Sequence, residues 1–122
     1  MTLEQIKNLL SLGENQRIEF KSSIRNLDAL GKTVSGFLNT AGGYLICGVS
    51  ESKGVIGIED SHDAVYKLER YLIEHISPKA FVAVQAEELN NKLVISIEVP
   101  AGSDVPYAFK MSFTSERVNS LK

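Results

Sequence analysis

The chain has 122 residues, of which 43% are hydrophobic and 23% are charged, and its formal net charge is −2. This length fits one domain around one core and excludes a chain of several domains, while the hydrophobic share excludes a disordered polypeptide. The acidic balance excludes binding to nucleic acid through overall charge, so such binding would need a local cluster of Lys and Arg.

The single cysteine, Cys47, cannot form an internal disulfide, which favours a reducing compartment. The first residues show no basic segment followed by an apolar stretch and a cleavage site. No apolar run approaches the ~18 residues that span a bilayer. We therefore predict a cytoplasmic protein with no membrane partner.

The first predicted element is a short amphipathic helix. Thr2 and Gln5 have the spacing of a capping box, and apolar residues then recur at helical intervals until Gly13, which suits a helix end. The next segment, residues 17–23, alternates with the two-residue period of a β-strand. Its apolar side chains are expected on one face, and the charged side chains on its other face are Arg17, Glu19 and Lys21.

A second helix is predicted from Leu27 to Asn39, because apolar residues follow a helical period up to the turn-forming sequence Thr-Ala-Gly-Gly at 40–43. Residues 44–50 are an almost continuous apolar run of strand length. After a Ser-Lys-Gly turn, residues 55–59 are expected to be the hairpin partner of that strand.

A third helix is predicted to begin at a Ser61 cap and to end before Pro78. Its apolar stripe comprises Val65, Leu68, Leu72, Ile73 and Ile76. Residues 81–89 and 92–100 then flank an Asn-Asn pair that is typical of a hairpin turn. The inward face of the second of these strands is expected to carry Leu93, Ile95, Ile97 and Val99.

Together these elements predict an α+β fold, in which two or three helices pack on a mixed, largely antiparallel sheet. We expect residues 1–122 to form a single domain. After an alternating stretch, the last residues turn polar without a clear final element, so we expect this domain to be the N-terminal part of a longer protein.

Three segments in order resemble the AlbA-like DNA-binding domain of the Schlafen family: GENQRIEFKSS, VSGFLNTAGGYLICGVSESKGVIGI and VPAGSDVPYAF. The residues that carry the resemblance are Gly13, Glu14, Glu19, Phe20, Lys21, Phe37, Asn39, Thr40, Gly42, Gly43, Gly48, Val49 and Gly57. The sequence departs from the family pattern at residues 117–120, Arg-Val-Asn-Ser, where the family often has Arg-Val-Gly-Ser. The resemblance implies a nucleic-acid-binding domain, with DNA or RNA as its partner, that is the recognition module of a transcriptional regulator.

The charged row of the strand at 17–23 supplies the first candidate phosphate contacts. Its side chains stand about 7 Å apart, although an ordinary solvated strand has the same pattern. Lys21 is the strongest single candidate. The resemblance implies that the turn at 39–43 lies beside the binding surface, where glycine lets a backbone approach a ligand. The predicted nucleic-acid-binding residues are Arg17, Lys21, Arg25, Lys32, Asn39, Thr40, Gly42, Gly43 and Arg117.

A metal-dependent endoribonuclease is the first alternative. The resemblance to Schlafen nucleases implies a site of three carboxylates, in which Glu14 and Glu19 match the first two catalytic positions. Ser50 stands at the third position, and its neighbour Glu51 is expected to face the other side of the strand. Two carboxylates alone hold a divalent ion poorly. We therefore expect Mg²⁺ or Mn²⁺ only if the domain is a nuclease, and we otherwise expect no cofactor.

A protein interaction or oligomerisation module, such as a homo-oligomer, is the second alternative, since the acidic charge and the apolar hairpins permit it. Nucleotide hydrolysis is not predicted: residues 31–33, Gly-Lys-Thr, resemble the end of a P-loop, but Asn26 stands where the leading glycine is needed. Neither His62 nor His75 has a second metal ligand at helical spacing, and no serine has the Gly-x-Ser-x-Gly context of a hydrolase.

Overall fold

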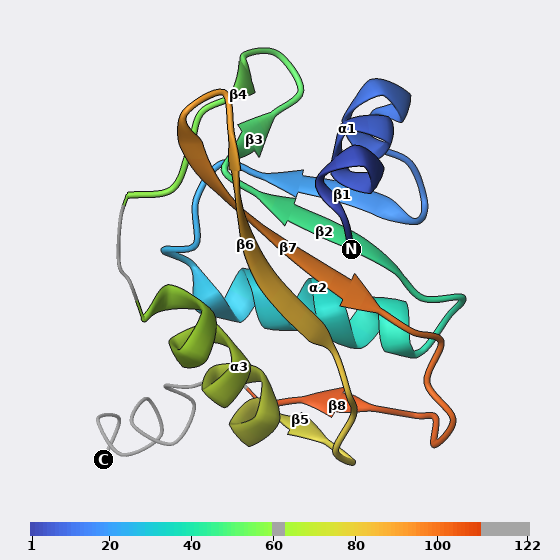
Figure 1. Ribbon diagram of the computed structural model, residues 1–122. Coiled ribbons are helices and arrows are strands. Elements are labelled where there is room, and N and C mark those ends of the chain that lie inside the picture. The colour runs from blue at the N-terminus through green and yellow to red at the C-terminus, as the bar shows by residue number, and fades with distance from the viewer. Residues whose placement is uncertain (60–62, 111–122) are drawn as a thin grey trace.

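The computed structural model describes residues 1–59 and 63–110, which form three helices, a four-stranded sheet and two short strand pairs (Figure 1). The helices are α1 (Leu3–Leu12), α2 (Leu27–Leu38) and α3 (Ala64–His75). The strands of the large sheet are β1 (Ile18–Lys21), β2 (Gly43–Cys47), β6 (Ala83–Leu89) and β7 (Lys92–Val99). The short strands are β3 (Val49–Ser50), β4 (Gly54–Val55), β5 (Ile76–Ser77) and β8 (Ala108–Phe109).

The four strands of the large sheet lie in the order β1, β2, β7, β6. β1 runs parallel to β2, whereas β7 is antiparallel to both of its neighbours. The parallel pair is connected through α2, since parallel neighbours need a crossover connection. This arrangement confirms the predicted α+β fold with a mixed, largely antiparallel sheet.

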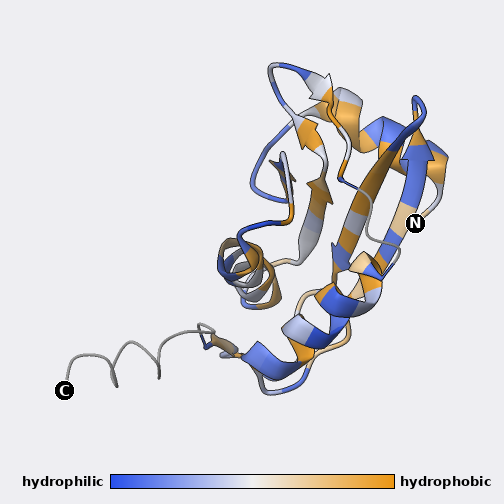
Figure 2. Cartoon of the chain, turned by 90° about the vertical axis from the view of Figure 1, so that its left-hand side faces the viewer, coloured by the Kyte–Doolittle hydropathy of each residue, from blue (hydrophilic) through white to orange (hydrophobic). Residues whose placement is uncertain are grey.

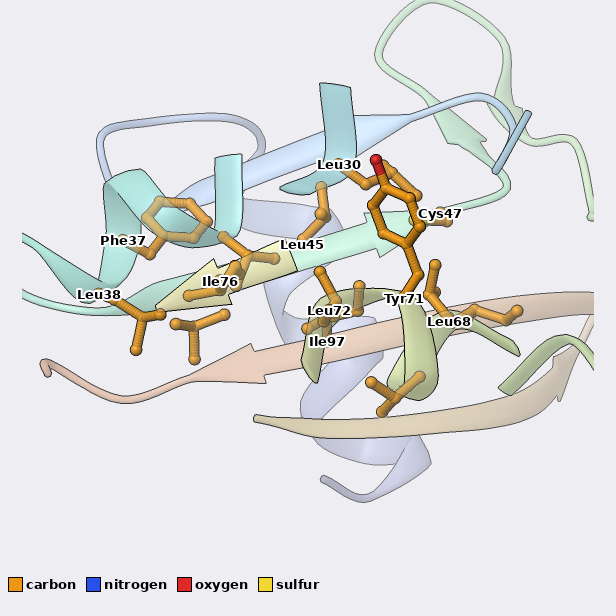
Figure 3. Close-up of a cluster of buried hydrophobic side chains, with 14 of the residues drawn as sticks. Leu30, Phe37, Leu38, Leu45, Cys47, Leu68, Tyr71, Leu72, Ile76 and Ile97 are labelled. Carbon is orange, nitrogen blue, oxygen red and sulfur yellow. The ribbon is translucent and has the colours of Figure 1, made fainter. Parts of the chain in front are cut away.

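Helices cover both faces of the sheet. α2 and α3 pack on one face, where Figure 3 shows Leu45 and Ile97 of the sheet meeting Leu30 of α2 and Leu68 of α3. α1 packs on the opposite face over a smaller core that contains Ile6, Ile46, Val49, Leu89 and Val94. Figure 2 shows apolar residues concentrated along the sheet, while the helices carry both hydrophobic and hydrophilic residues. The sheet is therefore the middle of three layers, and its central strands are apolar on both faces.

Local signals at the ends of elements have their predicted roles. The Gln5 backbone N–H donates to Thr2 Oγ1 at 3.2 Å, and the Thr2 backbone N–H donates to Gln5 Oε1 at 2.7 Å, which completes the capping box of α1. Asn90 and Asn91 have φ angles of 55° and 62°, the left-handed conformation that a two-residue hairpin turn requires. The predictions of the first helix and of the hairpin between β6 and β7 are confirmed.

The hairpin predicted between residues 44–50 and 55–59 is wrong for most of its length. Only β3 and β4 pair, through two residues on each strand. The apolar run of β2 lies instead between β1 and β7. A strand that is apolar on both faces is most stable in the centre of a sheet, and two neighbouring strands satisfy its backbone.

The apolar stripe predicted for the third helix is partly wrong. α3 begins after Asp63, and Ser61 lies outside the described residues. Ile73 is 51% exposed, whereas Tyr71 is buried against the core in its place. Ile76 is buried but belongs to β5.

The helices have modest lengths. α1 has 10 residues, and α2 and α3 have 12 each. Within the described part of the chain, no helix is long and apolar enough to cross a membrane.

Candidate nucleic-acid interface

The charged row of β1 faces α2 at the edge of the sheet. Lys21 Nζ lies 3.1 Å from Glu19 Oε2, and Thr33 Oγ1 of α2 lies 3.4 Å from the same carboxylate oxygen. These contacts bring β1 and the outer side of α2 together. Lys32 precedes Thr33 in α2 and is exposed, and its side chain leaves the helix about 100° away from that of Thr33.

Arg25 adds a third cation from the loop between β1 and α2. Its guanidinium lies 3.2 Å from the Glu59 carboxylate, and the two side chains are 83% and 90% exposed. A groove of about 830 Å³ lies between residues 22–25 and residues 56–59, and the side chains of Ser22 and Ser23 help to line it. We call this region, comprising Lys21, Arg25 and Lys32 with Glu19 and Glu59, the β1–α2 surface.

Arg17 lies apart from these cations. Its Nε donates to the carbonyl oxygen of Gly42 at 3.3 Å, so it sits at the start of β1 beside the turn that follows α2. Lys21 is four positions further along the chain, about 13 Å away at the usual rise of a strand. The predicted cations therefore occupy two places along β1.

Asn39 and Thr40 have clear structural partners. The Asn39 side-chain amide donates to the carbonyl oxygen of Tyr107 at 2.9 Å, and its Oδ1 accepts from the Tyr107 backbone N–H at 2.7 Å. Thr40 Oγ1 donates to the carbonyl oxygen of Gly36 at 2.9 Å, which satisfies an orphan acceptor near the end of α2. Asn39 therefore holds the segment that contains Tyr107, and Thr40 holds the turn after α2.

Replacement of Asn39 by alanine is expected to lower the free energy of unfolding by about 1–3 kcal/mol, because it leaves the Tyr107 backbone N–H without its partner and leaves the Tyr107 carbonyl oxygen with only the Ser35 hydroxyl at 3.5 Å. Urea denaturation followed by circular dichroism measures the change. Thr40→Ala, which removes one partly exposed hydroxyl next door, is the control and should cost less. Equal stability of Asn39→Ala and the original chain would contradict the structural role.

The two predicted catalytic carboxylates are engaged with separate partners. Glu14 Oε2 accepts from the Phe20 backbone N–H at 2.9 Å, whereas the Glu19 carboxylate pairs with Lys21. The Glu51 carboxylate accepts from the Glu14 backbone N–H at 2.6 Å. Across residues 1–59 and 63–110, no group of three His, Cys, Asp or Glu side chains is placed to hold a metal ion.

The P-loop-like residues and His75 have structural positions that do not suit catalysis or metal binding. Residues 31–33 lie within α2, whereas a P-loop precedes its helix. His75 Nδ1 lies 2.8 Å from the Tyr71 carbonyl oxygen, and its ring stacks on that of Tyr71. Arg117 and His62 lie outside the described residues.

Cys47 is buried beneath the β1–α2 surface. Burial raises the pKa of its thiol to about 12, and the positive charge of Lys21 opposes this shift only in part. The thiol therefore stays protonated at neutral pH and belongs to the core, as expected of an unreactive cysteine.

Residues 14–121 match the family model described as Schlafen, AlbA_2. The chain therefore belongs to the Schlafen AlbA_2 family, which confirms the resemblance found in the sequence. The N-terminal domain of a RecG-related protein from Nitrosomonas europaea has a similar structure, with a TM-score of 0.70 and 22% sequence identity over 89% of this chain and 80% of that chain. The DIP2311 protein of Corynebacterium diphtheriae is also similar, with a TM-score of 0.64 and 22% identity over 86% of this chain and 23% of that chain.

A curated relative, the uncharacterized ATP-binding protein UU034 of Ureaplasma parvum, is 34% identical over 48% of this chain and 20% of its own length. The chain thus spans 20% of this relative and 23% of the Corynebacterium protein. The similarity to the solved structures, at 22% identity, supports the fold alone.

Proposed function

We propose that this domain binds nucleic acid, DNA or RNA, through the β1–α2 surface. The observation that carries the proposal is the position of Lys21, which pairs with Glu19 next to Thr33 of α2, with the exposed cations Arg25 and Lys32 on the segments that follow in an otherwise acidic molecule. Family membership supports the same function.

The acids in the β1–α2 surface do not prevent phosphate binding. An exposed ion pair contributes only about 0–1 kcal/mol, so a phosphate can displace Glu59 from Arg25 at little cost. Of the residues that define this surface, three are cations and two are carboxylates. The hydroxyls of Ser22 and Ser23 add hydrogen-bond donors of the kind that contact phosphate oxygens.

A nucleic-acid strand that runs along β1 would reach both groups of cations. Lys21, Arg25 and Lys32 bind phosphates at one end in this proposal. Arg17 and the turn at 39–43 approach the backbone about 13 Å away.

We further propose that residues 1–122 form one domain of a longer regulator, in which this domain recognises nucleic acid. The name of the Nitrosomonas relative relates that protein to RecG, an ATP-dependent DNA helicase, which fits a module that works next to a nucleic-acid-processing or regulatory part. The small share of the larger relatives that this chain spans also supports this proposal.

Charge reversal at Lys21 is expected to weaken nucleic-acid binding by about tenfold and to reduce the salt dependence by about one phosphate contact. Fluorescence anisotropy with labelled single-stranded and duplex DNA and RNA, at two salt concentrations, measures both quantities. Lys7→Glu is the matched control, because Lys7 is exposed on α1, over the opposite face of the sheet.

Comparison of the two variants distinguishes an effect of the local charge at the β1–α2 surface on binding affinity from an effect of the net charge of the protein. A loss of affinity in Lys21→Glu with little change in Lys7→Glu supports the β1–α2 surface. Equal losses would assign binding to net charge, and unchanged affinity of Lys21→Glu would remove Lys21 from the interface. Absence of binding to all four ligands at low salt would refute the proposed function.

A further inference from the structure

A second surface, at the opposite edge of the sheet, carries exposed apolar side chains. Phe81 is 95% exposed just before β6, and Ile73 of α3 is 51% exposed. Tyr66, two helical turns before Ile73 on the same side of α3, is 58% exposed. Exposed aromatic and aliphatic side chains gathered at one place are typical of an interaction surface.

These side chains border a groove between α3 and the segment that leads into β6. The groove has a volume of about 390 Å³ and is lined by Glu69, Ile73, Lys79, Ala80, Phe81 and Val82. It has apolar walls and one charge of each sign. No ion pair among the described residues involves either Glu69 or Lys79.

An apolar groove that carries its own unpaired acid and base is complementary to a copy of itself. In a two-fold symmetric contact, residue i of one subunit meets residue j of the other, and j meets i. Glu69 of each subunit can then pair with Lys79 of its partner, while each Phe81 fills the apolar groove of the other subunit.

We propose that this face, which comprises Tyr66, Glu69, Ile73, Lys79 and Phe81, is the interface of a homodimer. β6 is an edge strand at the end of the sheet opposite β1. Association at this edge leaves the β1–α2 surface of each subunit open. The dimer does not depend on the proposed nucleic-acid function, and it would present two such surfaces to one ligand.

Sedimentation velocity from low micromolar to near-millimolar protein tests the dimer without any nucleic acid. The original chain should shift from the monomer mass toward twice that mass as its concentration rises. Phe81→Ser should abolish the shift without unfolding the chain, because the removed ring lies almost wholly in solvent. Leu12→Ser is the matched control, since Leu12 is 70% exposed on α1 and lies outside this face.

Charge reversals test the pairing itself. Glu69→Lys and Lys79→Glu should each weaken self-association by roughly tenfold or more, because a two-fold contact repeats each like-charge pair. Mixing these two single variants should restore dimers, since the mixed dimer again pairs opposite charges at both positions. A chain with both reversals should also dimerise.

Three outcomes would overturn the proposal. They are a monomeric original chain at every concentration, a dimer that Phe81→Ser leaves intact, and a mixture of the two charge variants that forms no more dimer than either variant alone. Circular dichroism and thermal unfolding of each variant establish that it is folded before its mass is interpreted.

Discussion

Replacement of Gly42 by alanine is expected to lower the free energy of unfolding by more than about 3 kcal/mol. Gly42 has a φ of 82°, which an alanine adopts only at a cost. A Cβ at this position would also stand 2.6 Å from the carbonyl oxygen of Val99 and 2.8 Å from the backbone nitrogen of Ala101. These neighbours are backbone atoms at the end of β7, so the sheet itself would have to move.

Gly36→Ala is the matched control for this prediction. Gly36 lies in the exposed side of α2, and a Cβ there would meet no atom within 4 Å. The same substitution should therefore stabilise the domain by about 0.5–1 kcal/mol through helix propensity and reduced freedom of the unfolded chain. Urea denaturation of both variants should give shifts of opposite sign. A Gly42→Ala variant as stable as the original chain would show that the turn after α2 tolerates a side chain.

Replacement of Leu45 by alanine is expected to cost about 3–5 kcal/mol of unfolding free energy. Leu45 is fully buried in β2, between β1 and β7, and its side chain lies in the larger core with α2 and α3. Packed elements on both sides limit how far the structure can relax into the space left behind. This is a large share of a small domain's stability, because the total is only about 5–15 kcal/mol.

Leu12→Ala is the control for the core substitution. It removes the same atoms from an exposed position on α1 and should change the unfolding free energy by less than about 0.5 kcal/mol. Both variants are measured by urea denaturation, and the slope of each transition checks that unfolding remains two-state. A small cost at Leu45 would mean that the larger core repacks more freely than its burial indicates.

The cations proposed to bind phosphate lie apart from the buried core position Leu45. Lys21, Arg25 and Lys32 have side chains that are at least partly exposed, and none belongs to either core. Binding and stability can therefore be changed separately. Gly42 and Asn39 are expected to affect both stability and nucleic-acid binding, because the turn that they shape supports the core and lies beside Arg17.

The candidate site was only partly predictable from the sequence. The alternation in residues 17–21 correctly indicates that Glu19 and Lys21 share a face, and the contact of Glu19 with Thr33 agrees with this. The pairing of Arg25 with Glu59 joins residues 34 positions apart and leaves no local pattern. The same holds for Asn39, whose partner Tyr107 is 68 positions away.

The sequence by itself determined the elements whose signals are local, namely the capping box of α1 and the hairpin turn at Asn90-Asn91. It also determined the family to which residues 14–121 belong. Only the tertiary structure decided which strands β2 pairs with, which side of α3 remains exposed, and how the cations divide between two places on β1. The physical reason is the distance along the chain over which each kind of interaction acts. Caps, turns and periodicity act between neighbours in the chain, whereas strand order and surface composition depend on contacts that form only when the layers close on one another.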